Sequence, residues 1–572
     1  MAALAPLLLA AVCVPALLAF NEPPSPTALN QAAAIAGWGG VLVAAAAGAG
    51  PARAAISRAG VLLAALALVA AAAFLSSTLG SLPWALGGSA LGLLAATMVL
   101  AAGGASLRAP LPLLTAFHAA WVVAGLASAL VALVQVFAPQ WADGQWIARS
   151  GIAGRAVGNL RQPNHLATLL LWSVAALVPL HEACRGSSRA RAASVAAWLA
   201  AALLLFGVML SGSRTGLLGV VVLAAWGLLD RRLSGAARAL LLATPLLCAA
   251  GWILLEWLAA AQSGPAALGA AARVGERDAS GGRFSIWRDT LALISQHPWL
   301  GVGFGEFNFA WTLTPSAARH PAFFDHTHNL PLQLAAELGL PATLLVLGLL
   351  GWALWQAFER SWRAPGTQGV ALRTSFVMVL LMALHSQLEY PLWYAYFLLP
   401  TALAWGLCMG AGPDAGMARS GPAFDGRWAS AAGLAVLAGA LAMTADYRKA
   451  VVIFSPGDSA RPLTARIEQG RGSWFFAHHA DYALVTTSDA TPAEFGRAPH
   501  YLLDSRLMMA WAEALARAGD IDRARHVAAR LREFRNANAG AFFAPCDDPA
   551  VIDKPFQCQP PSRAWRWSDF TR

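Results

Sequence analysis

A histidine-rich segment, Asp325-His-Thr-His-Asn-Leu-Pro331, comes directly before a long apolar run. Pro331 is typical of the first turn of a helix, where its missing N–H costs nothing. We therefore expect His328 and Asn329 at the mouth of a membrane span. The positive end of the helix dipole disfavours a charged imidazole, and a neutral imidazole accepts a proton. His328 is predicted to be a general base.

Two other roles are open for these histidines. His328 could cap the helix, or it could share a metal ion with His326. We predict no metal, because no nearby group of Cys, His or carboxylate residues completes a ligand set in the sequence.

A second polar segment, Gly158-Asn-Leu-Arg-Gln-Pro-Asn-His-Leu166, opens another apolar run. Asn164 could cap the helix. The density of amide and basic groups, Arg161, Gln162 and His165, exceeds what a cap needs. Such side chains suit sugar hydroxyls and phosphate oxygens, so we predict that they bind substrate.

A third polar segment, His385-Ser-Gln-Leu-Glu-Tyr-Pro-Leu-Trp-Tyr394, separates two apolar runs. Tyr390 and Tyr394 could belong to the aromatic belt at a membrane interface. Glu389 is predicted to bind substrate, because a carboxylate at a membrane boundary usually has a partner. For Glu337, inside a span, a structural ion pair and a catalytic role stay equally open.

Several arginines lie between predicted spans, at positions where binding of an anionic ligand would explain their presence. Arg214 lies in the short turn Ser211-Gly-Ser-Arg-Thr-Gly216, and Arg283 and Arg288 lie in a long loop, 261–328. Guanidinium groups bind phosphate oxygens bidentately. Arginines in a long loop can also be simply solvated, but that reading fits Arg214 poorly because its turn is so short.

The elements that must position these residues are membrane helices. The chain is 58% hydrophobic and 12% charged, against about 25% charged residues in a soluble domain. Apolar runs long enough to cross a bilayer follow one another up to residue 445. They predict an all-α bundle of about thirteen spans: 3–20, 31–48, 59–76, 83–104, 112–137, 164–181, 193–211, 215–230, 238–260, 329–357, 370–388, 391–410 and 428–445.

The distribution of arginines among the loops also predicts the orientation of the bundle in the membrane. Alternate loops carry basic residues and are assigned to the cytoplasm by the positive-inside rule: Arg53 with Arg58, Arg108, Arg185 with Arg189 and Arg191, Arg231 with Arg232 and Arg238, Arg360 with Arg363 and Arg373, and Arg419 with Arg427. Residues 1–20 lack a basic start and a cleavage site, so we expect a first span and not a signal peptide. The three polar segments and the tail then face the periplasm.

Residues 446–572 form the second predicted domain, after a membrane domain of 1–445. Leu507, Trp511 and Leu515 recur at helical spacing, and a break at Gly519 predicts a helix–turn–helix pair similar to a TPR unit. Cys546 and Cys558 could form a disulfide or stay free. The net charge of +10 forms no basic stripe with interleaved aromatics, so nucleic acid is not expected.

These motifs together resemble the O-antigen ligase/Wzy polymerase superfamily. The resemblance rests on the histidine motif, the Ser-Gly-Ser-Arg turn and the loop Gly282-Arg-Phe-Ser-Ile-Trp-Arg288…His297-Pro-Trp-Leu-Gly-Val-Gly303. Arg161-Gln-Pro-Asn-His165 and Glu389-Tyr-Pro-Leu-Trp-Tyr394 look like the PglL-type O-oligosaccharyltransferases. The His-Asn, nine residues, Gly pattern is matched by His328, Asn329 and Gly339, with Ala342 as a mild departure.

The resemblance implies a GT-C-like membrane enzyme without a cofactor in the bacterial inner membrane. It would transfer an oligosaccharide from undecaprenyl pyrophosphate to a Ser/Thr hydroxyl of a pilin or other periplasmic protein. His328 would deprotonate the acceptor. Arg214 and Arg283 would hold the pyrophosphate, with Arg288 a weaker candidate, and Gln162 and Tyr390 match positions that PglL-type enzymes need. The alternatives are a lipopolysaccharide ligase or polysaccharide polymerase, and a transporter of lipid-linked sugars.

Overall fold

The computed structural model describes residues 4–48, 54–55, 58–107, 109–261, 282–411, 423–424, 426–457, 461–487 and 489–571. Within these ranges the chain is all-α, as predicted, apart from two-residue strands β1 (Ala54–Ala55) and β2 (Ala423–Phe424), which pair antiparallel. Three of the arginines used to predict orientation lie outside the described residues: Arg53, Arg108 and Arg419.

Each of the thirteen predicted spans coincides with a helix or a helix pair. Nine helices of the described chain are long and apolar enough to cross a membrane: α2 (Ala28–Gly48), α3 (Gly60–Thr78), α4 (Trp84–Ser106), α5 (Leu111–Phe137), α6 (Pro163–Ala183), α7 (Ala190–Ser211), α14 (Leu330–Arg363), α15 (Gly366–His385) and α17 (Gly426–Phe454).

The remaining predicted spans coincide with shorter or broken helices. α1 (Leu4–Leu17), α8 (Arg214–Leu229) and α16 (Ala395–Gly410) are apolar but shorter. The predicted span 238–260 is broken into α9 (Gly235–Leu242) and α10 (Thr244–Ala261), which bend by 41°. The number of membrane crossings therefore stays a prediction.

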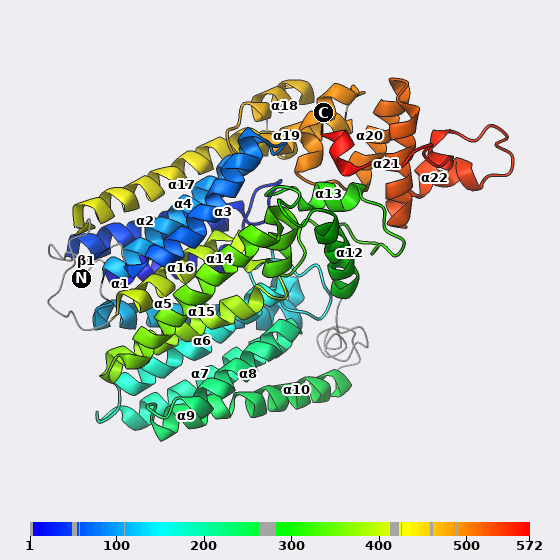
Figure 1. Ribbon diagram of the computed structural model, residues 1–572. Helices are drawn as coiled ribbons and strands as arrows, with labels where there is room; N and C mark the ends of the chain where they lie inside the picture. Colours follow the sequence, from blue (N-terminus) through cyan, green and yellow to red (C-terminus); the bar gives the residue numbers. More distant parts are fainter. Residues whose placement is uncertain are drawn as a thin grey trace. The chain divides into compact units, whose positions relative to one another are not determined.

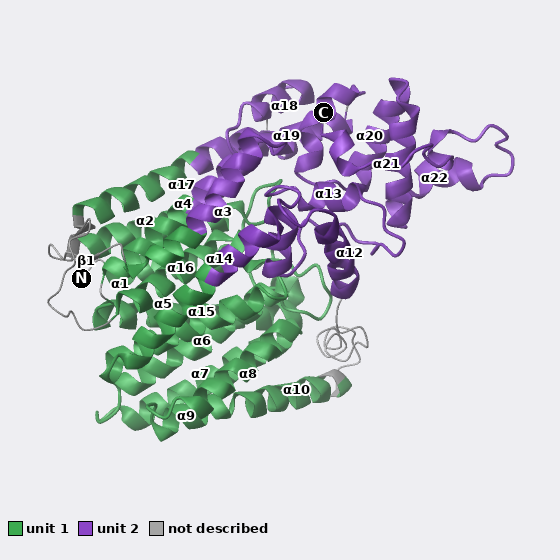
Figure 2. Ribbon diagram, viewed as in Figure 1, with its two compact units in different colours: residues 1–65, 95–279, 349–442 green, residues 66–94, 280–348, 443–572 purple. Residues whose placement is uncertain are grey.

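The helices fall into two compact units (Figure 2). Unit 1 contains residues 1–65, 95–279 and 349–442. Its centre is α6, of which 89% is buried in the protein and which lies beside α5, α7 and α8 (Figure 1). α5 and α6 approach closely because Gly125 has no side chain: a Cβ there would lie 2.1 Å from the hydroxyl of Ser173. Small residues at such crossings are typical of membrane helix pairs.

Unit 2 contains residues 66–94, 280–348 and 443–572. Thus the tail groups with the long loop, the α3–α4 turn and the beginning of α14. The loop is helical over α12 (Arg283–Gln296) and α13 (Phe307–Leu313). The predicted sequence boundary at 445 stays a prediction, although α17 continues through it to Phe454.

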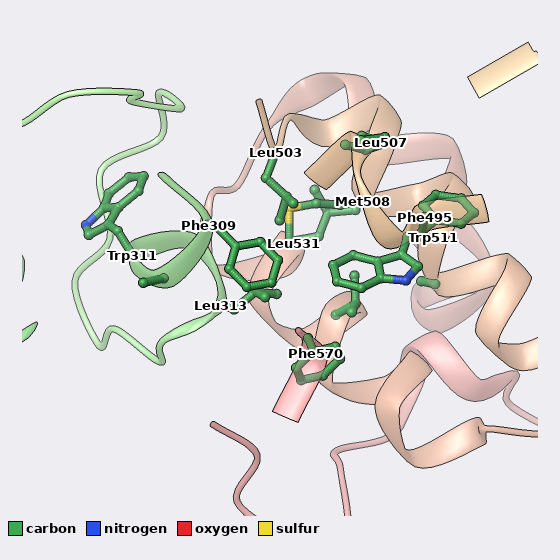
Figure 3. Packing of buried hydrophobic residues seen from close by; sticks show 14 of the residues in the cluster. Phe309, Trp311, Leu313, Phe495, Leu503, Leu507, Met508, Trp511, Leu531 and Phe570 are labelled. Carbon is green, nitrogen blue, oxygen red and sulfur yellow. The ribbon is translucent and has the colours of Figure 1, made fainter. Parts of the chain in front are cut away.

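One hydrophobic core joins the loop to the tail (Figure 3). Phe309, Trp311 and Leu313 of α13 belong to the same buried cluster as Leu507, Trp511 and Leu531 of the tail, and Phe570. The tail residues come from α20 (Ser505–Arg517) and α21 (Ile521–Glu533), which begin after the caps Asp504 and Asp520. This is the predicted helix pair, and its resemblance to a TPR unit stays a prediction.

The tail is completed by smaller elements: α18 (Leu463–Arg471), α19 (Ala477–Thr487) and α22 (Gly540–Asp547). Cys546 at the end of α22 forms a disulfide with Cys558. The sequence left this pair open between a disulfide and free thiols, and the structure selects the disulfide. Protein disulfides persist mainly in oxidising compartments, which agrees with the predicted periplasmic position of the tail.

Candidate active site

The predicted site residues divide between the two units. Unit 1 holds Arg161, Gln162, His165, Arg214, Glu389 and Tyr390, and unit 2 holds Arg283, Arg288, His326, His328 and Asn329. Within each unit, the structure brings together residues that are far apart in the sequence.

In unit 1, the polar segment 158–166 contains the start of α6. Gln162 is the N-cap: its Oε1 accepts the backbone N–H of His165 at 2.8 Å, and Pro163 occupies the first turn. The sequence offered Asn164 as the cap, and this was wrong. Gln162 takes the role because it stands immediately before the proline, at the position where the chain is still extended.

Asn164 is instead the centre of a network that joins three motifs. Its Nδ2 donates to Glu389 Oε1 at 2.8 Å, and its Oδ1 accepts from the hydroxyl of Ser213 at 2.6 Å. A carboxylate only accepts hydrogen bonds, so this contact fixes which way the amide points. The segment before α6, the Ser-Gly-Ser-Arg turn and the Glu389 hairpin therefore meet at one side chain.

The Ser211–Gly216 turn places an arginine at a helix start. α7 ends with Gly212 in the left-handed conformation (φ 57°), and the hydroxyl of Ser213 caps α8 by accepting the N–H of Gly216 at 3.0 Å. Arg214 is thus the first residue of α8. Helix N-termini already carry partial positive charge, so a cation is unfavourable there unless an anion is bound.

Other predicted residues of unit 1 hold the network in place. His165 is only 2% exposed; its Nδ1 lies 3.1 Å from the hydroxyl of Tyr396, and its ring is edge-on to Tyr394. Arg161 has a left-handed backbone (φ 59°) and donates from Nη2 to the carbonyl of Ala19 at 2.8 Å. Their contacts are those of positioning residues.

The ring of Tyr390 lies 6.2 Å from that of Tyr394, measured between ring centres. Tyr394 in turn contacts His165. The predicted tyrosine is thereby connected through one aromatic neighbour to the segment that begins α6, in agreement with a shared site for the two motifs.

Replacing Asn164 tests this network. We expect Asn164→Ala to lower kcat/KM for the glycan transfer that the resemblance implies about tenfold or more, because a hydrogen bond to a charged group contributes roughly 1.5–3 kcal/mol. Asn164→Asp has the same shape but faces Glu389 with a second carboxylate, so its loss should be at least as large. Transfer assays on purified variants of matched thermal stability would measure both. Equal activity of Asn164→Asp and the parent would contradict the role of the network.

In unit 2, the histidine motif is a tight turn before α14. Asn329 caps the helix by accepting the N–H of Leu332 at 2.9 Å, so the alternative that His328 is the cap was wrong. The backbone of His328 is left-handed, with φ 55°. Thr327 stabilises the turn by donating its hydroxyl to the carbonyl of Asn329 at 2.7 Å.

His326 lies beside an acidic neighbour in the same turn. Its Nδ1 is 2.9 Å from Asp325 Oδ1. Partial burial works against the charge on Asp325, but the imidazoles of His326 and His328 outweigh it and hold the pKa of this carboxyl at about 2. The turn thus holds an ionised carboxylate next to both imidazoles.

Arg283 and the histidine motif are linked through α12. Arg283 is the first residue of α12, after Gly282 (φ 84°). One turn on, the indole N–H of Trp287 donates to the carbonyl of Thr327 at 2.9 Å. Both arginines predicted to hold pyrophosphate, Arg214 and Arg283, are therefore first residues of helices.

Arg288 differs from these two. Its guanidinium bonds Asp289 at 3.1 Å and the carbonyl of Ala318 at 3.0 Å, and its side chain is 58% exposed. It mainly secures the loop after α13.

Gly339 breaks α14 just beyond the histidine motif. Its backbone (φ 76°, ψ 167°) is not helical, and the next N–H, of Leu340, donates to the carbonyl of Pro298 at 2.7 Å. A Cβ on Gly339 would lie 2.3 Å from the carbonyl oxygen of Trp299. The glycine of the predicted motif is required because the 298–303 loop occupies that space.

We expect Gly339→Ala to destabilise the protein by on the order of 3 kcal/mol or more, since this conformation is almost restricted to glycine and the added carbon clashes. Gly348→Ala, in the same helix and with no atom within 4 Å of the added Cβ, should instead be neutral or slightly stabilising. Thermal unfolding of the two variants in detergent would compare them. A Gly339→Ala protein as stable as Gly348→Ala would exclude this reason for the glycine.

The start of α13 ties the histidine turn to the tail. Glu306 accepts from the hydroxyl of Ser81 at 3.1 Å and lies 2.7 Å from Nδ1 of His500. Asn308 bonds the carbonyl of Phe324 and the N–H of Leu503, both at 2.8 Å. These buried contacts hold the segment that leads to His328.

Comparisons with known proteins agree with this geometry. The O-antigen ligase family model matches residues 199–347, which include the Ser-Gly-Ser-Arg turn and the histidine motif. A model for the C-terminal part of virulence factor membrane-bound polymerases matches 373–542, and the protein glycosylation ligase model matches 156–181, the segment that begins α6. Over these segments the chain is similar to the superfamily of O-antigen ligases and protein glycosylation ligases.

A curated member of this superfamily is also similar to the chain. It is described as a general O-oligosaccharyltransferase of Acinetobacter baylyi, 29% identical over 266 residues. The match covers 46% of this chain and 44% of that protein, so this chain spans under half of the relative's length.

Several residues of the candidate site were not singled out from sequence. Ser213 stood inside a quoted motif, and Asn164 was considered only as a helix cap, because their contacts depend on three segments meeting. Glu306, Asn308 and His500 gave no signal, because buried polar pairs between distant segments have no local pattern. Among the described residues, no group of three His, Cys, Asp or Glu side chains lies close enough to hold a metal.

Proposed function

We propose that the protein transfers a preassembled oligosaccharide from undecaprenyl pyrophosphate to a Ser or Thr hydroxyl of a periplasmic protein. The observation that carries the proposal is the place of the protein glycosylation ligase match, residues 156–181. It covers the start of α6, where Asn164 joins Glu389 and Ser213. The name of the similar Acinetobacter protein supports the same activity.

The chemistry follows from the residues present. An imidazole nitrogen of His328 takes the proton of the acceptor hydroxyl as its oxygen forms a bond to the anomeric carbon. The bond from that carbon to the pyrophosphate oxygen breaks, and undecaprenyl pyrophosphate leaves. Attack opposite the leaving group inverts the anomeric configuration.

Arg214 and Arg283 would neutralise the leaving pyrophosphate. Each adds a guanidinium to a helix N-terminus, and this combination favours phosphate oxygens. Charge neutralisation by such groups can serve in place of a metal ion. We therefore propose that both arginines act on the same donor, with Gln162, Tyr390 and Glu389 placing its sugars or the acceptor.

Substitution of these arginines tests the leaving-group role. We expect Arg214→Gln and Arg283→Gln each to lower kcat about a hundredfold or more, in the range known for lost transition-state donors. Lysine at either position should restore only part, because an ammonium lacks the forked geometry. Arg288→Gln should lose much less, since Arg288 lies more than one turn inside α12 and not at a helix start. Equal losses at all three positions would contradict the assignment.

The second candidate is an O-antigen ligase or polysaccharide polymerase, favoured by the matches over 199–347 and 373–542. Mass spectrometry of periplasmic proteins from cells with and without the gene separates the two. Loss of glycosylated pilins or other proteins supports protein transfer, and loss of lipopolysaccharide or polymer with intact glycoproteins supports the alternative. A transporter would instead leave lipid-linked donor on the cytoplasmic side.

A further inference from the structure

A cavity lies at the end of α6 opposite Asn164. Asn164 and His181 are separated by most of the helix, roughly 25 Å at 1.5 Å per residue. The cavity has a volume of about 260 Å³, many times the ~10–15 Å³ that accommodates one water by this kind of measure. Its lining comes from α6, α7 and the start of α9: His181, Arg185, Ala190, Ser194, Ser234, Gly235 and Ala236.

A buried histidine forms the inner wall. His181 is 8% exposed, and its Nε2 lies 2.9 Å from the hydroxyl of Ser194. Its Nδ1 is buried and has no hydrogen-bond partner in the described part of the chain. Buried polar atoms nearly always have a partner, so this nitrogen indicates a group that the protein itself does not supply.

The outer wall is basic. Arg185 is 58% exposed and bonds Glu182 at 3.0 Å, while the other oxygen of Glu182 accepts the N–H of Ser234. Other arginines in the segments that precede α7 and follow α8 add positive charge: Arg189, Arg231 and Arg232. The neighbouring Asp230 does not offset them, because it is buried in an ion pair with Arg373 at 2.6 Å.

Helix geometry adds to this charge. α7 begins at Ala190 and α9 at Gly235, and both residues line the cavity. Two positive helix ends, an exposed guanidinium and a buried imidazole together form a site for an anion with several oxygen acceptors. The carboxylate of Glu182 already accepts hydrogen bonds from Arg185 and Ser234. A further anionic acceptor must therefore come from a ligand, and a phosphate group fits this role.

We propose that this cavity binds the phosphate of an anionic phospholipid headgroup. α6 and α7 are long and apolar enough to cross a membrane. The ends of helices that cross a membrane lie at headgroup depth, where basic residues recognise anionic lipids. The site is separate from the proposed transfer reaction, which uses the other end of α6.

The test uses the full chain in detergent and measures ligand binding by native mass spectrometry. The probes are short-chain phosphatidylglycerol, short-chain phosphatidylcholine and inorganic phosphate. We expect phosphatidylglycerol to bind at least about tenfold more tightly than phosphatidylcholine, because the zwitterionic headgroup carries its own cation. Equal affinity for phosphatidylglycerol and inorganic phosphate would overturn the lipid assignment in favour of a free anion.

Two variants address the cavity itself. Arg185→Gln removes the exposed guanidinium, and Gly235→Met fills the cavity from a position where an added Cβ meets no atom within 4 Å. Each should weaken phosphatidylglycerol binding about tenfold or more. The matched control, Arg191→Gln, removes the same charge from an exposed residue outside the lining and should change affinity less than about twofold. Equal effects of Arg185→Gln and Arg191→Gln would overturn the site and leave only a diffuse surface charge.

Discussion

Replacing His328 with glycine is expected to abolish glycan transfer without loss of stability. The left-handed backbone of His328 (φ 55°) is strained for any side chain but not for glycine. The variant should therefore unfold at the same or a slightly higher temperature than the parent. Transfer should fall by about 10²–10⁴-fold, the usual contribution of a general base.

The comparison variant is His328→Gln, which keeps a polar side chain but cannot take up a proton. We expect the same loss of transfer, measured as glycosylated acceptor formed per minute from purified donor. A general base also predicts that the loss appears mainly in kcat. Substantial transfer by His328→Gln at normal protein levels would exclude proton removal by this residue.

Removing the tail is expected to abolish all reactions of the donor, including those that need no protein acceptor. Phe307, Phe309 and Trp311 of the loop are buried in the core shared with the tail. Burial of each such side chain contributes ~1.5–3 kcal/mol, so deletion of residues 455–572 withdraws an amount comparable to the whole stability of a domain. The segment that carries His328 would lose its support.

This outcome differs from that expected of a tail that only recruits acceptors. If the tail only guided protein acceptors to the membrane site, deletion of 446–572 would impair protein glycosylation alone. Acceptor-free hydrolysis of the lipid-linked donor distinguishes the two roles. A truncated protein that still hydrolyses the donor but does not glycosylate protein would support recruitment and contradict the structural role.

A milder variant addresses the same question without truncation. His500→Ala leaves the carboxylate of Glu306 buried without the imidazole that lies 2.7 Å away, and a buried charge that loses its partner is strongly destabilising. Donor hydrolysis should decline together with thermal stability. Lost protein transfer with unchanged stability and hydrolysis would again favour recruitment.

The membrane helices could be predicted because every helix that crosses a bilayer must be apolar over a similar length. Apolar length alone located each of them. The breaks could not be predicted in the same way. The bend between α9 and α10 lies beside Pro245, and the kink at Gly339 arises where the 298–303 loop approaches the backbone. Hydropathy records neither feature.

For the candidate site, the residue types indicated which segments contribute to it, but they did not indicate the local role of each residue. Pro331 correctly marked a helix start. The cap of α6, however, is Gln162, and Asn164 serves a longer-range network. The grouping of the tail with the loop could not be predicted, since Phe309 and Trp511 are separated by about two hundred positions and each reads only as part of a local apolar face.

The shared core also has a consequence for biogenesis. Phe309 is synthesised long before Leu507 and Phe570, and at ~5–20 residues per second the interval is on the order of 10–50 s. During this time the exported loop exposes large aromatic side chains that only the later tail can cover. A nascent chain stalled before residue 500 should therefore be a client for chaperones and proteases, and the protein would become competent only after its last helices have been made.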